Sequence, residues 1–199
     1  PHHLCHAAST FWVSEFDEAI CLVYDGGMAN EDWFGAIYHA SRDQGIEVVD
    51  RFAAHQYANV AYLYSTVTGI LGFSPLKHEG KITGLAAYGT DNPACKARLL
   101  EWLTHPNMVD GLSYWQDMYS AEKVPVLKRN INRAEQLRES LSEFSKEDLA
   151  YAVQKIAEEH ILDILRSLKN ANISSKKICL SGGLFANVKI NQRVSEFGF

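Results

Sequence analysis

Residues 18–27 read EAICLVYDGG and predict the strand around which the rest of the fold is built. The apolar, β-rich run Ile20–Tyr24 is typical of a buried strand. It ends at Asp25, Gly26 and Gly27, which form a turn signal. A carboxylate in that place, followed by residues without a Cβ atom, can hold a divalent ion or approach a phosphate closely. Taken alone, the same residues favour a simple β-turn.

Two more strands are predicted after this one. FGAIYH at 34–39 and IEVVDRF at 46–52 have strand composition, and the polar turn RDQG at 42–45 lies between them. Three short consecutive strands predict an antiparallel meander. Before the first strand, HHLCHAASTFWV at 2–13 lacks glycine and proline and can form a helix.

Helical periodicity replaces the strand pattern in the middle of the chain. QYANVAYLYSTVTGILGF at 56–73 predicts a helix that ends near Gly72, and Ala94–Leu103 predicts another. The glycine-punctuated stretch 74–91 between them is expected to be a loop. The signal at 105–130 is poor and suggests an irregular insertion.

The clearest helix starts at Ser145, because Ser145–Asp148 fits a capping box. A short strand at 178–180 follows it, and a helix is expected from Leu184 onward. His160 lies on the apolar stripe of the long helix and is interpreted as a core residue rather than a ligand. We predict an α/β fold. The stripe consists of Leu149, Val153, Ile156, His160, Ile164 and Leu168.

The composition of the 199-residue chain is that of an ordinary soluble globular protein with one core or two small domains. A net charge of −5 lacks the excess of basic residues that a nucleic-acid-binding protein needs. No apolar run approaches the ~20 residues of a membrane span, and there is no signal-peptide pattern. The four cysteines are scattered, which favours reduced thiols and a cytoplasmic location. Because the chain begins at Pro1, we expect it to be part of a larger protein.

A histidine cluster at the N-terminus could bind a metal. On a helix, His2 and His6 lie one turn apart on one face, a spacing that suits two imidazole ligands. His3 points roughly 100° away from them, and it occupies the position that is Glu in the His-Glu-x-x-His metalloprotease motif. Cys5 could add a third ligand, although packing is the more common role of an unclustered cysteine. Spacing alone supports a metal site and ordinary surface or packed histidines equally; a vector-derived tag is disfavoured by the interruption at residues 4–5.

Two glycine-containing segments could face a phosphate. Ser181–Asn187 (SGGLFAN) is a strand-to-helix turn, and N–H groups at a helix N-terminus favour anions. It is neither a Walker A loop nor a G-x-G-x-x-G motif. GKITGLAAYG at 80–89 also fails the P-loop test, since Pro75 replaces the first glycine and Ile82 follows the lysine. Spacing therefore allows a loop with one cation, Lys81, or a plain surface loop.

In chain order, four separated motifs carry a family resemblance: HHLCHAASTFWVSEF, AICLVYDGG, GKITGLAAYG and ICLSGGLFANVKINQRV. In this order they resemble the carbamoyltransferases of the NodU/CmcH type, which O-carbamoylate nodulation factors and antibiotics. The resemblance spans nearly the whole chain except 105–132. It implies that 1–199 is a partial catalytic domain, mainly the second subdomain of an actin-like (ribonuclease H-like) ATPase fold, with an irregular insertion at 105–132. The related ATPase makes threonylcarbamoyladenosine in tRNA.

The resemblance also implies a set of site residues. His2, His6 and Asp25 would bind a divalent metal, for which iron, zinc and manganese all suit the ligands. His3 could serve as a catalytic base or donor. ATP or carbamoyladenylate would lie against a nucleotide-binding set made of Gly26, Gly27, Lys81, Gly84, Gly182, Gly183 and Asn187.

Some parts of the family pattern are absent from the sequence. A further metal-binding Asp, expected downstream of the Gly-Gly helix, is not reached, and Met28 follows Gly27 where relatives often carry more glycine or an acidic residue. The YrdC-like domain that makes carbamoyladenylate from ATP and carbamoyl phosphate is expected elsewhere in the parent chain. The expected activity is transfer of a carbamoyl group from carbamoyladenylate to an acceptor hydroxyl.

Two alternatives stay open. The chain could be an actin-like ATP-binding module, or a tRNA threonylcarbamoyl-transfer relative without O-carbamoylation activity. A simple zinc hydrolase is weakened by the missing Glu. We expect small-molecule substrates, and neither a membrane nor a nucleic acid as partner.

Overall fold

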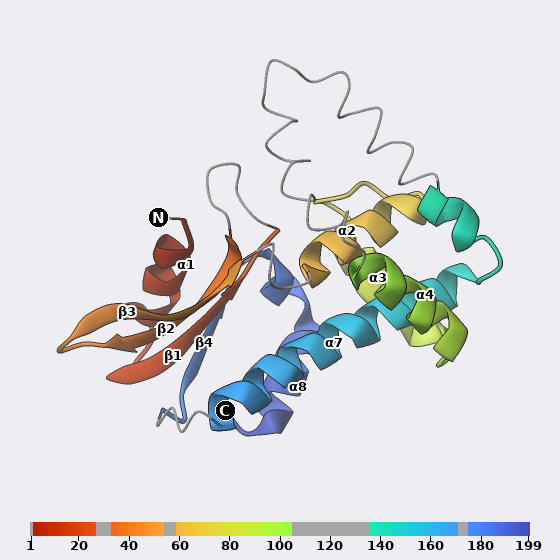
Figure 1. Cartoon of the computed structure of the whole chain (residues 1–199). Helices are drawn as coiled ribbons and strands as arrows, with labels where there is room; N and C mark the ends of the chain where they lie inside the picture. Colours follow the sequence, from red (N-terminus) through yellow and green to blue (C-terminus); the bar gives the residue numbers. More distant parts are fainter. Residues whose placement is uncertain (1, 27–32, 54–58, 105–135, 171–174) are drawn as a thin grey trace, which may run out of the picture. The chain divides into compact units, whose positions relative to one another are not determined.

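The computed structural model describes residues 2–26, 33–53, 59–104, 136–170 and 175–199 (Figure 1). The chain forms two compact units, one of residues 1–57 with 158–199 and one of residues 58–157. The predicted insertion at 105–132 lies outside the described residues. In chain order the elements are α1 (His2–Phe11), β1 (Glu18–Tyr24), β2 (Trp33–Ser41), β3 (Gly45–Ala53), α2 (Val60–Ile70), α3 (Glu79–Leu85), the 3-10 turn η1 (Ala86–Tyr88), α4 (Pro93–Thr104), α7 (Lys146–Asn170), β4 (Ile178–Ser181), the 3-10 turn η3 (Gly183–Ala186) and α8 (Val188–Phe197).

A four-stranded mixed sheet forms the centre of the first unit, in the order β3-β2-β1-β4. The predicted antiparallel meander is confirmed, because β1 pairs with β2 and β2 with β3 in antiparallel fashion. β4 then joins the other edge of β1 in parallel, with Cys21 opposite Cys179 and Val23 opposite Ser181. The chain is thus α/β, as predicted, and the actin-like ATPase fold remains a prediction.

Both faces of this sheet are covered, which is why β1 is buried from Ala19 to Tyr24. On one face, Ala7 and Phe11 of α1 pack against alternate residues of β1 and against Cys179 of β4. On the opposite face, the ring of Tyr24 lies 5.6 Å from the ring of His160 in α7. Figure 1 shows α1 on one side of the sheet and α8, with the later part of α7, on the other.

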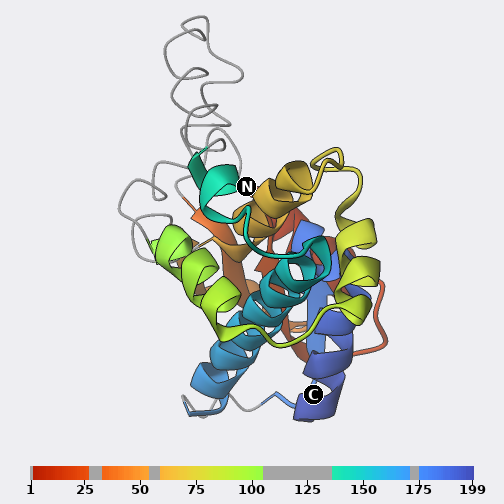
Figure 2. The same ribbon diagram turned by 90° about the vertical axis from the view of Figure 1, so that its right-hand side faces the viewer.

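The later part of α7 and α8 both lie in front of the sheet in the view of Figure 2, which faces the right-hand side of Figure 1. Arg193 Nε of α8 donates to the buried Glu158 carboxylate at 3.2 Å, and Lys169 Nζ donates to the Phe197 carbonyl at 3.1 Å. The helix predicted from Leu184 is corrected here. Gly183–Ala186 forms a single 3-10 turn, and the α-helix begins only at Val188.

The second unit is helical. The Asn59 side chain accepts from Tyr62 N–H and caps α2, and the Tyr64 hydroxyl donates to Gln154 of α7 at 2.9 Å. The predicted cap of α7 is confirmed, because Asp148 N–H donates to Ser145 Oγ at 3.0 Å. The Asp148 carboxylate instead accepts from the N–H and hydroxyl of Thr90.

Two sequence predictions about the helices need correction. The stretch 74–91 is not a loop throughout, since α3 and η1 occupy 79–88. The buried stripe of α7 passes through Ile161 and Leu165 rather than Ile164, because the helical face turns slightly after His160. None of the described helices has the length and apolar character required to cross a membrane.

His160 has the partner expected of a packed histidine, because its Nε2 lies 3.2 Å from the Tyr24 hydroxyl, although the residue is half-buried rather than fully in the core. Burial lowers the pKa of His160 to about 4, against the opposing effect of Asp163. The unfolded chain, with an ordinary histidine pKa of 6.5, binds a proton between pH 6.5 and 4 that the folded chain does not bind. The free energy of unfolding therefore keeps its full value above pH 6.5 and falls as the pH drops toward 4.

We predict that His160→Gln removes part of this acid sensitivity. Between pH 7 and pH 4, the wild type should lose about 3 kcal/mol more stability than the variant, measured by urea unfolding of the full-length protein. Tyr24→Phe, which removes the hydroxyl partner of His160 but leaves the imidazole in place, is the control and should keep the acid sensitivity of the wild type. The same loss of stability with falling pH in the wild type and in His160→Gln would show that His160 is not a source of the acid sensitivity.

Candidate metal centre

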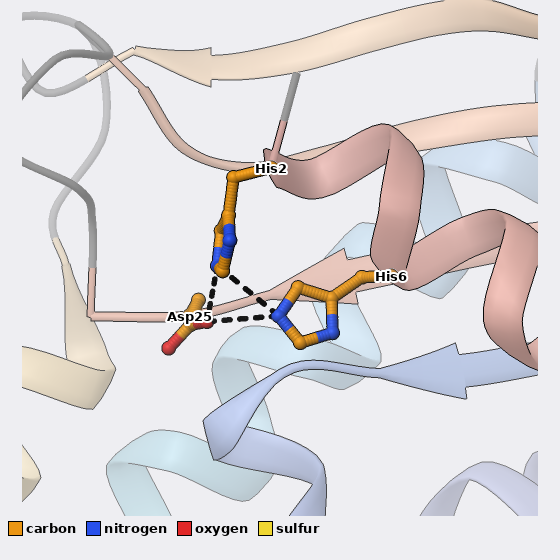
Figure 3. Close-up of side chains that lie close together, drawn as sticks. All are labelled: His2, His6 and Asp25. Atoms are coloured by element: carbon orange, nitrogen blue, oxygen red, sulfur yellow. Dashed lines mark hydrogen bonds and ion pairs between the residues drawn. The ribbon is translucent and has the colours of Figure 1, made fainter.

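Three side chains from α1 and the end of β1 converge on one point (Figure 3). His2 Nε2 lies 3.2 Å from Asp25 Oδ2, and His6 Nε2 lies 3.3 Å from the same oxygen. The two Nε2 atoms are 3.1 Å apart. Among the described residues, this is the single group of three or more His, Cys, Asp or Glu side chains close enough to hold a metal ion.

The local folding of the sequence explains this convergence. α1 buries His3, Ala7 and Phe11, so this face of the helix is fixed against the sheet. His2 and His6 are one turn apart and project together from the neighbouring face. Because strand side chains alternate, Asp25 points to the same side of the sheet as Val23, which α1 covers.

The separations within this trio fit metal ligands. Two ligand atoms bound about 2.1 Å from one ion, at an angle of about 90–110°, lie about 3.0–3.4 Å apart. All three observed separations fall in that range. Hydrogen bonds account for at most two of these three contacts, because each of the two Nε2 atoms carries at most one proton and donates it in one direction. The chemistry of the donor set, two imidazoles and a carboxylate, suits iron, zinc or manganese.

The surroundings of Asp25 favour the charged form of its carboxylate. Burial acts to raise the pKa of Asp25, but the Gly26 N–H bond to Oδ1 (2.7 Å) and the nearby His2 and His6 rings outweigh it and lower that pKa below its ordinary value. A carboxylate that remains charged at neutral pH can act as a metal ligand without first losing a proton.

The trio is partly open to solvent. The side chains of His2 and His6 are 33% and 29% exposed, and that of Asp25 is 26% exposed. Structural metal sites are usually closed by four protein ligands, whereas catalytic sites use three and leave a position for water or substrate. Among the described residues, the three partly exposed side chains therefore leave room for a further ligand, water or substrate.

Ser181, at the end of β4, contacts the trio from the other side. Its Oγ lies 3.1 Å from His6 Nδ1, the ring nitrogen that does not face Asp25. Ser181 is the first residue of the predicted strand-to-helix turn, and the sequence pattern alone assigns it no role. Its position at the last residue of a strand, directly before Gly182, is the signal that could have indicated it.

Gly182 and Gly183 bring the turn after β4 against the end of β1. Gly182 has a φ of +96°, and a Cβ atom there would lie 2.3 Å from the Tyr24 carbonyl oxygen. A Cβ at Gly183 would lie 3.1 Å from Asp25 Oδ1. Close packing therefore requires glycine at position 182, whereas a Cβ at position 183 would crowd the Asp25 carboxylate.

Asn187, the last of the predicted nucleotide-binding residues in the turn after β4, caps α8, since its side-chain oxygen accepts from the N–H groups of Lys189 and Ile190.

The other predicted nucleotide-binding residues, Lys81 and Gly84, lie in α3 of the second unit, where Lys81 Nζ is 5.3 Å from the centre of the Phe73 ring. Gly27 lies outside the described residues. The predicted nucleotide contacts of these residues stay predictions.

His3, the residue predicted as a base, is completely buried beside His2, with ring centres 5.3 Å apart. The His3 ring is not part of the His2, His6 and Asp25 group, as its direction on the helix predicts. The ring does not reach solvent in this structure.

Cys5 is exposed and is also outside that group. All four cysteines are free, as predicted, and burial raises the pKa of Cys21 to about 12, so that thiol is unreactive at neutral pH.

The fold and the site thus define an α/β domain with a two-histidine, one-carboxylate cluster beside its sheet that could hold a metal ion. Over residues 1–199 the sequence matches the family described as carbamoyltransferase N-terminus, and the chain belongs to that family. The carbamoyltransferase part of the resemblance is therefore confirmed.

Relatives of this chain occur in archaea and bacteria. It is 25% identical to the uncharacterised protein MJ1058 of Methanocaldococcus jannaschii over 98% of the chain and 32% of that protein. It is 28% identical to the nodulation protein NolNO of Sinorhizobium fredii over 99% of the chain and 27% of the relative. The nodulation protein NolO of Bradyrhizobium diazoefficiens is 26% identical over 99% of the chain and 33% of its own length. The chain thus spans about a third of these relatives.

We predict that Gly182→Ala lowers stability more than Gly45→Ala. Both glycines have positive φ, but a Cβ at Gly45 meets nothing within 4 Å. The extra loss at Gly182, from the clash with Tyr24, should be about 1–3 kcal/mol, measured by urea unfolding of the full-length protein. Equal losses for the two variants would show that the close approach of the turn to β1 is not needed.

Proposed function

We propose that this chain provides the metal centre of an O-carbamoyltransferase. The reaction is transfer of the carbamoyl group of carbamoyladenylate to an acceptor hydroxyl, giving a carbamate ester and AMP. The observation that carries the proposal is the convergence of His2, His6 and Asp25 in a chain of the carbamoyltransferase family. ATP and carbamoyl phosphate would supply carbamoyladenylate through a YrdC-like domain elsewhere in the protein, which we place in the cytoplasm.

The trio would hold the divalent ion, and the ion would supply Lewis-acid chemistry, polarising a carbonyl or neutralising a phosphate. Asp25 contributes a carboxylate that is charged at neutral pH, and the two histidines contribute imidazole nitrogens. The partial exposure of all three side chains leaves access for a substrate oxygen.

The nucleotide would lie along the glycine turn next to the trio. A Cβ at Gly183 would contact Asp25 Oδ1, so a phosphate that approaches this backbone comes close to the metal ligands. Gly182, Gly183 and Asn187 belong to this segment, and Gly26 is on the facing strand end. We include Gly27, Lys81 and Gly84 in the proposed nucleotide-binding set.

The second candidate is an actin-like ATP-binding module, or a tRNA threonylcarbamoyl-transfer relative, without O-carbamoylation activity. The metal-ligand geometry favours the enzyme over the module, because a nucleotide switch alone does not require two imidazoles and a carboxylate on one ion. A YrdC-like domain in the same protein would favour O-carbamoyl transfer, and its absence would favour the second candidate.

We predict that His6→Ala in the full-length protein abolishes carbamoyl transfer and bound metal together while the fold is kept. The loss of one of three ligands leaves too few donors to hold the ion. Metal content by mass spectrometry, circular dichroism and release of AMP with a hydroxyl acceptor would be measured on the same sample. His39→Ala is the control, since His39 pairs with Glu18 at the surface and should retain both properties. Unchanged turnover in His6→Ala would remove the metal from the mechanism.

Asn187 allows nucleotide binding to be separated from helix capping. Asn187→Asp keeps a good N-cap oxygen for α8, but it removes the amide N–H donors and adds a charge that repels phosphate. We expect weaker ATP binding by calorimetry with little change in stability. Asn187→Ser, which keeps a capping oxygen without the charge, is the matched control and should bind ATP better than Asn187→Asp. Equal ATP affinity in the wild type and both variants would restrict Asn187 to capping.

A further inference from the structure

We propose that Ser181 is a positioning residue that fixes the ring orientation of His6 for metal binding. The inference rests on the proposed metal centre and adds a residue to it. Ser181 and His6 are 175 positions apart in the sequence, yet Ser181 Oγ and His6 Nδ1 are 3.1 Å apart.

The chemistry of a neutral imidazole makes this contact directional. Such a ring carries one proton, on either Nδ1 or Nε2. His6 Nε2 faces Asp25 Oδ2 and His2 Nε2, so its lone pair must be free for it to act as a metal ligand. The proton then belongs on Nδ1, where it is donated to Ser181 Oγ. Metal-binding histidines typically donate their second N–H to a fixed acceptor in this way.

The hydroxyl of Ser181 is held in place by the backbone on both sides. Ser181 pairs with Val23 in the parallel β1–β4 ladder. The next residue, Gly182, lies directly against the Tyr24 backbone. Only 9% of Ser181 is exposed, so neighbouring atoms limit the directions in which its side chain can turn.

His6 is held equally well on the helix side, because Ala7 and Phe11 anchor α1 on the same sheet. The contact between His6 and Ser181 therefore joins two rigid elements, and the imidazole plane follows from where they meet. Without the hydroxyl, the ring would keep its place on α1 but lose the acceptor that favours the Nδ1–H form.

The hydrogen bond is tested first on the full-length protein loaded with Zn²⁺ and labelled with ¹⁵N-histidine, with His6→Gln used to assign the His6 signals. With Nε2 on the ion, the His6 proton is on Nδ1, where its exchange with solvent can be followed. We expect this proton to exchange more slowly in the wild type than in Ser181→Ala. Equal exchange rates would overturn the proposal, because a serine that does not accept this hydrogen bond would not protect the proton.

Metal affinity gives the second measurement, by competition between the protein and a chelator for Zn²⁺. Ser181→Ala should bind Zn²⁺ about 10- to 100-fold more weakly than the wild type, the usual effect of losing such a partner. Ser14→Ala is the matched control, because Ser14 is a partly buried serine just beyond the other end of α1. Its hydroxyl donates a hydrogen bond to the Phe11 carbonyl and accepts one from Phe16 N–H. It should bind Zn²⁺ like the wild type.

Ser181→Thr and Ser181→Val separate the hydroxyl from the shape of the side chain and serve also if Ser181→Ala fails to fold. The two variants have nearly the same volume, and only threonine retains the acceptor. Tighter Zn²⁺ binding by Ser181→Thr than by Ser181→Val supports the role, and equal binding overturns it. If the wild type binds none of Zn²⁺, Fe²⁺ and Mn²⁺, the proposed metal centre fails; if it binds Zn²⁺ and Ser181→Ala binds it equally well, only the role of Ser181 fails.

Discussion

The parallel pairing of β1 with β4 is the constraint on which the candidate site depends. It places Ser181 opposite Val23 and leads the chain into Gly182, which packs on the Tyr24 backbone. The ends of both strands thereby meet under the first turn of α1. Asp25 approaches His2 and His6 from one strand, and Ser181 approaches His6 from the other. Moving β4 by one residue would turn Ser181 to the opposite face and separate these groups.

Burial on both faces of the sheet makes this arrangement rigid. α1 anchors the face that carries the trio, and the later part of α7 covers the face that carries Tyr24. Neither the three residues of the trio nor Ser181 is on a long loop in the described part of the chain. Such support from helices and strands is what a catalytic metal site requires, because ligand positions must be accurate to a fraction of an ångström.

Much of this could be predicted from sequence where the signals are local. The strand before Asp25, the meander, the helix that carries His2 and His6, and the cap at Ser145 all depend on residues close in the chain. What sequence could not give is long-range geometry. The His6–Ser181 contact needs the β1–β4 register, and the approach of Gly182 to Tyr24 needs the three-dimensional turn. α3 was missed because Gly80 and Gly84 favour a loop locally, whereas Ile82 is buried in the structure and anchors the helix.

The central claim is that His2, His6 and Asp25 share one metal ion, and anomalous X-ray diffraction of the full-length protein tests it most directly. Crystals grown with the metal that co-purifies would be measured above and below its absorption edge. The account predicts one anomalous peak about 2.0–2.3 Å from His2 Nε2, His6 Nε2 and Asp25 Oδ2. A peak elsewhere, or three side chains in direct contact with no peak between them, would contradict it.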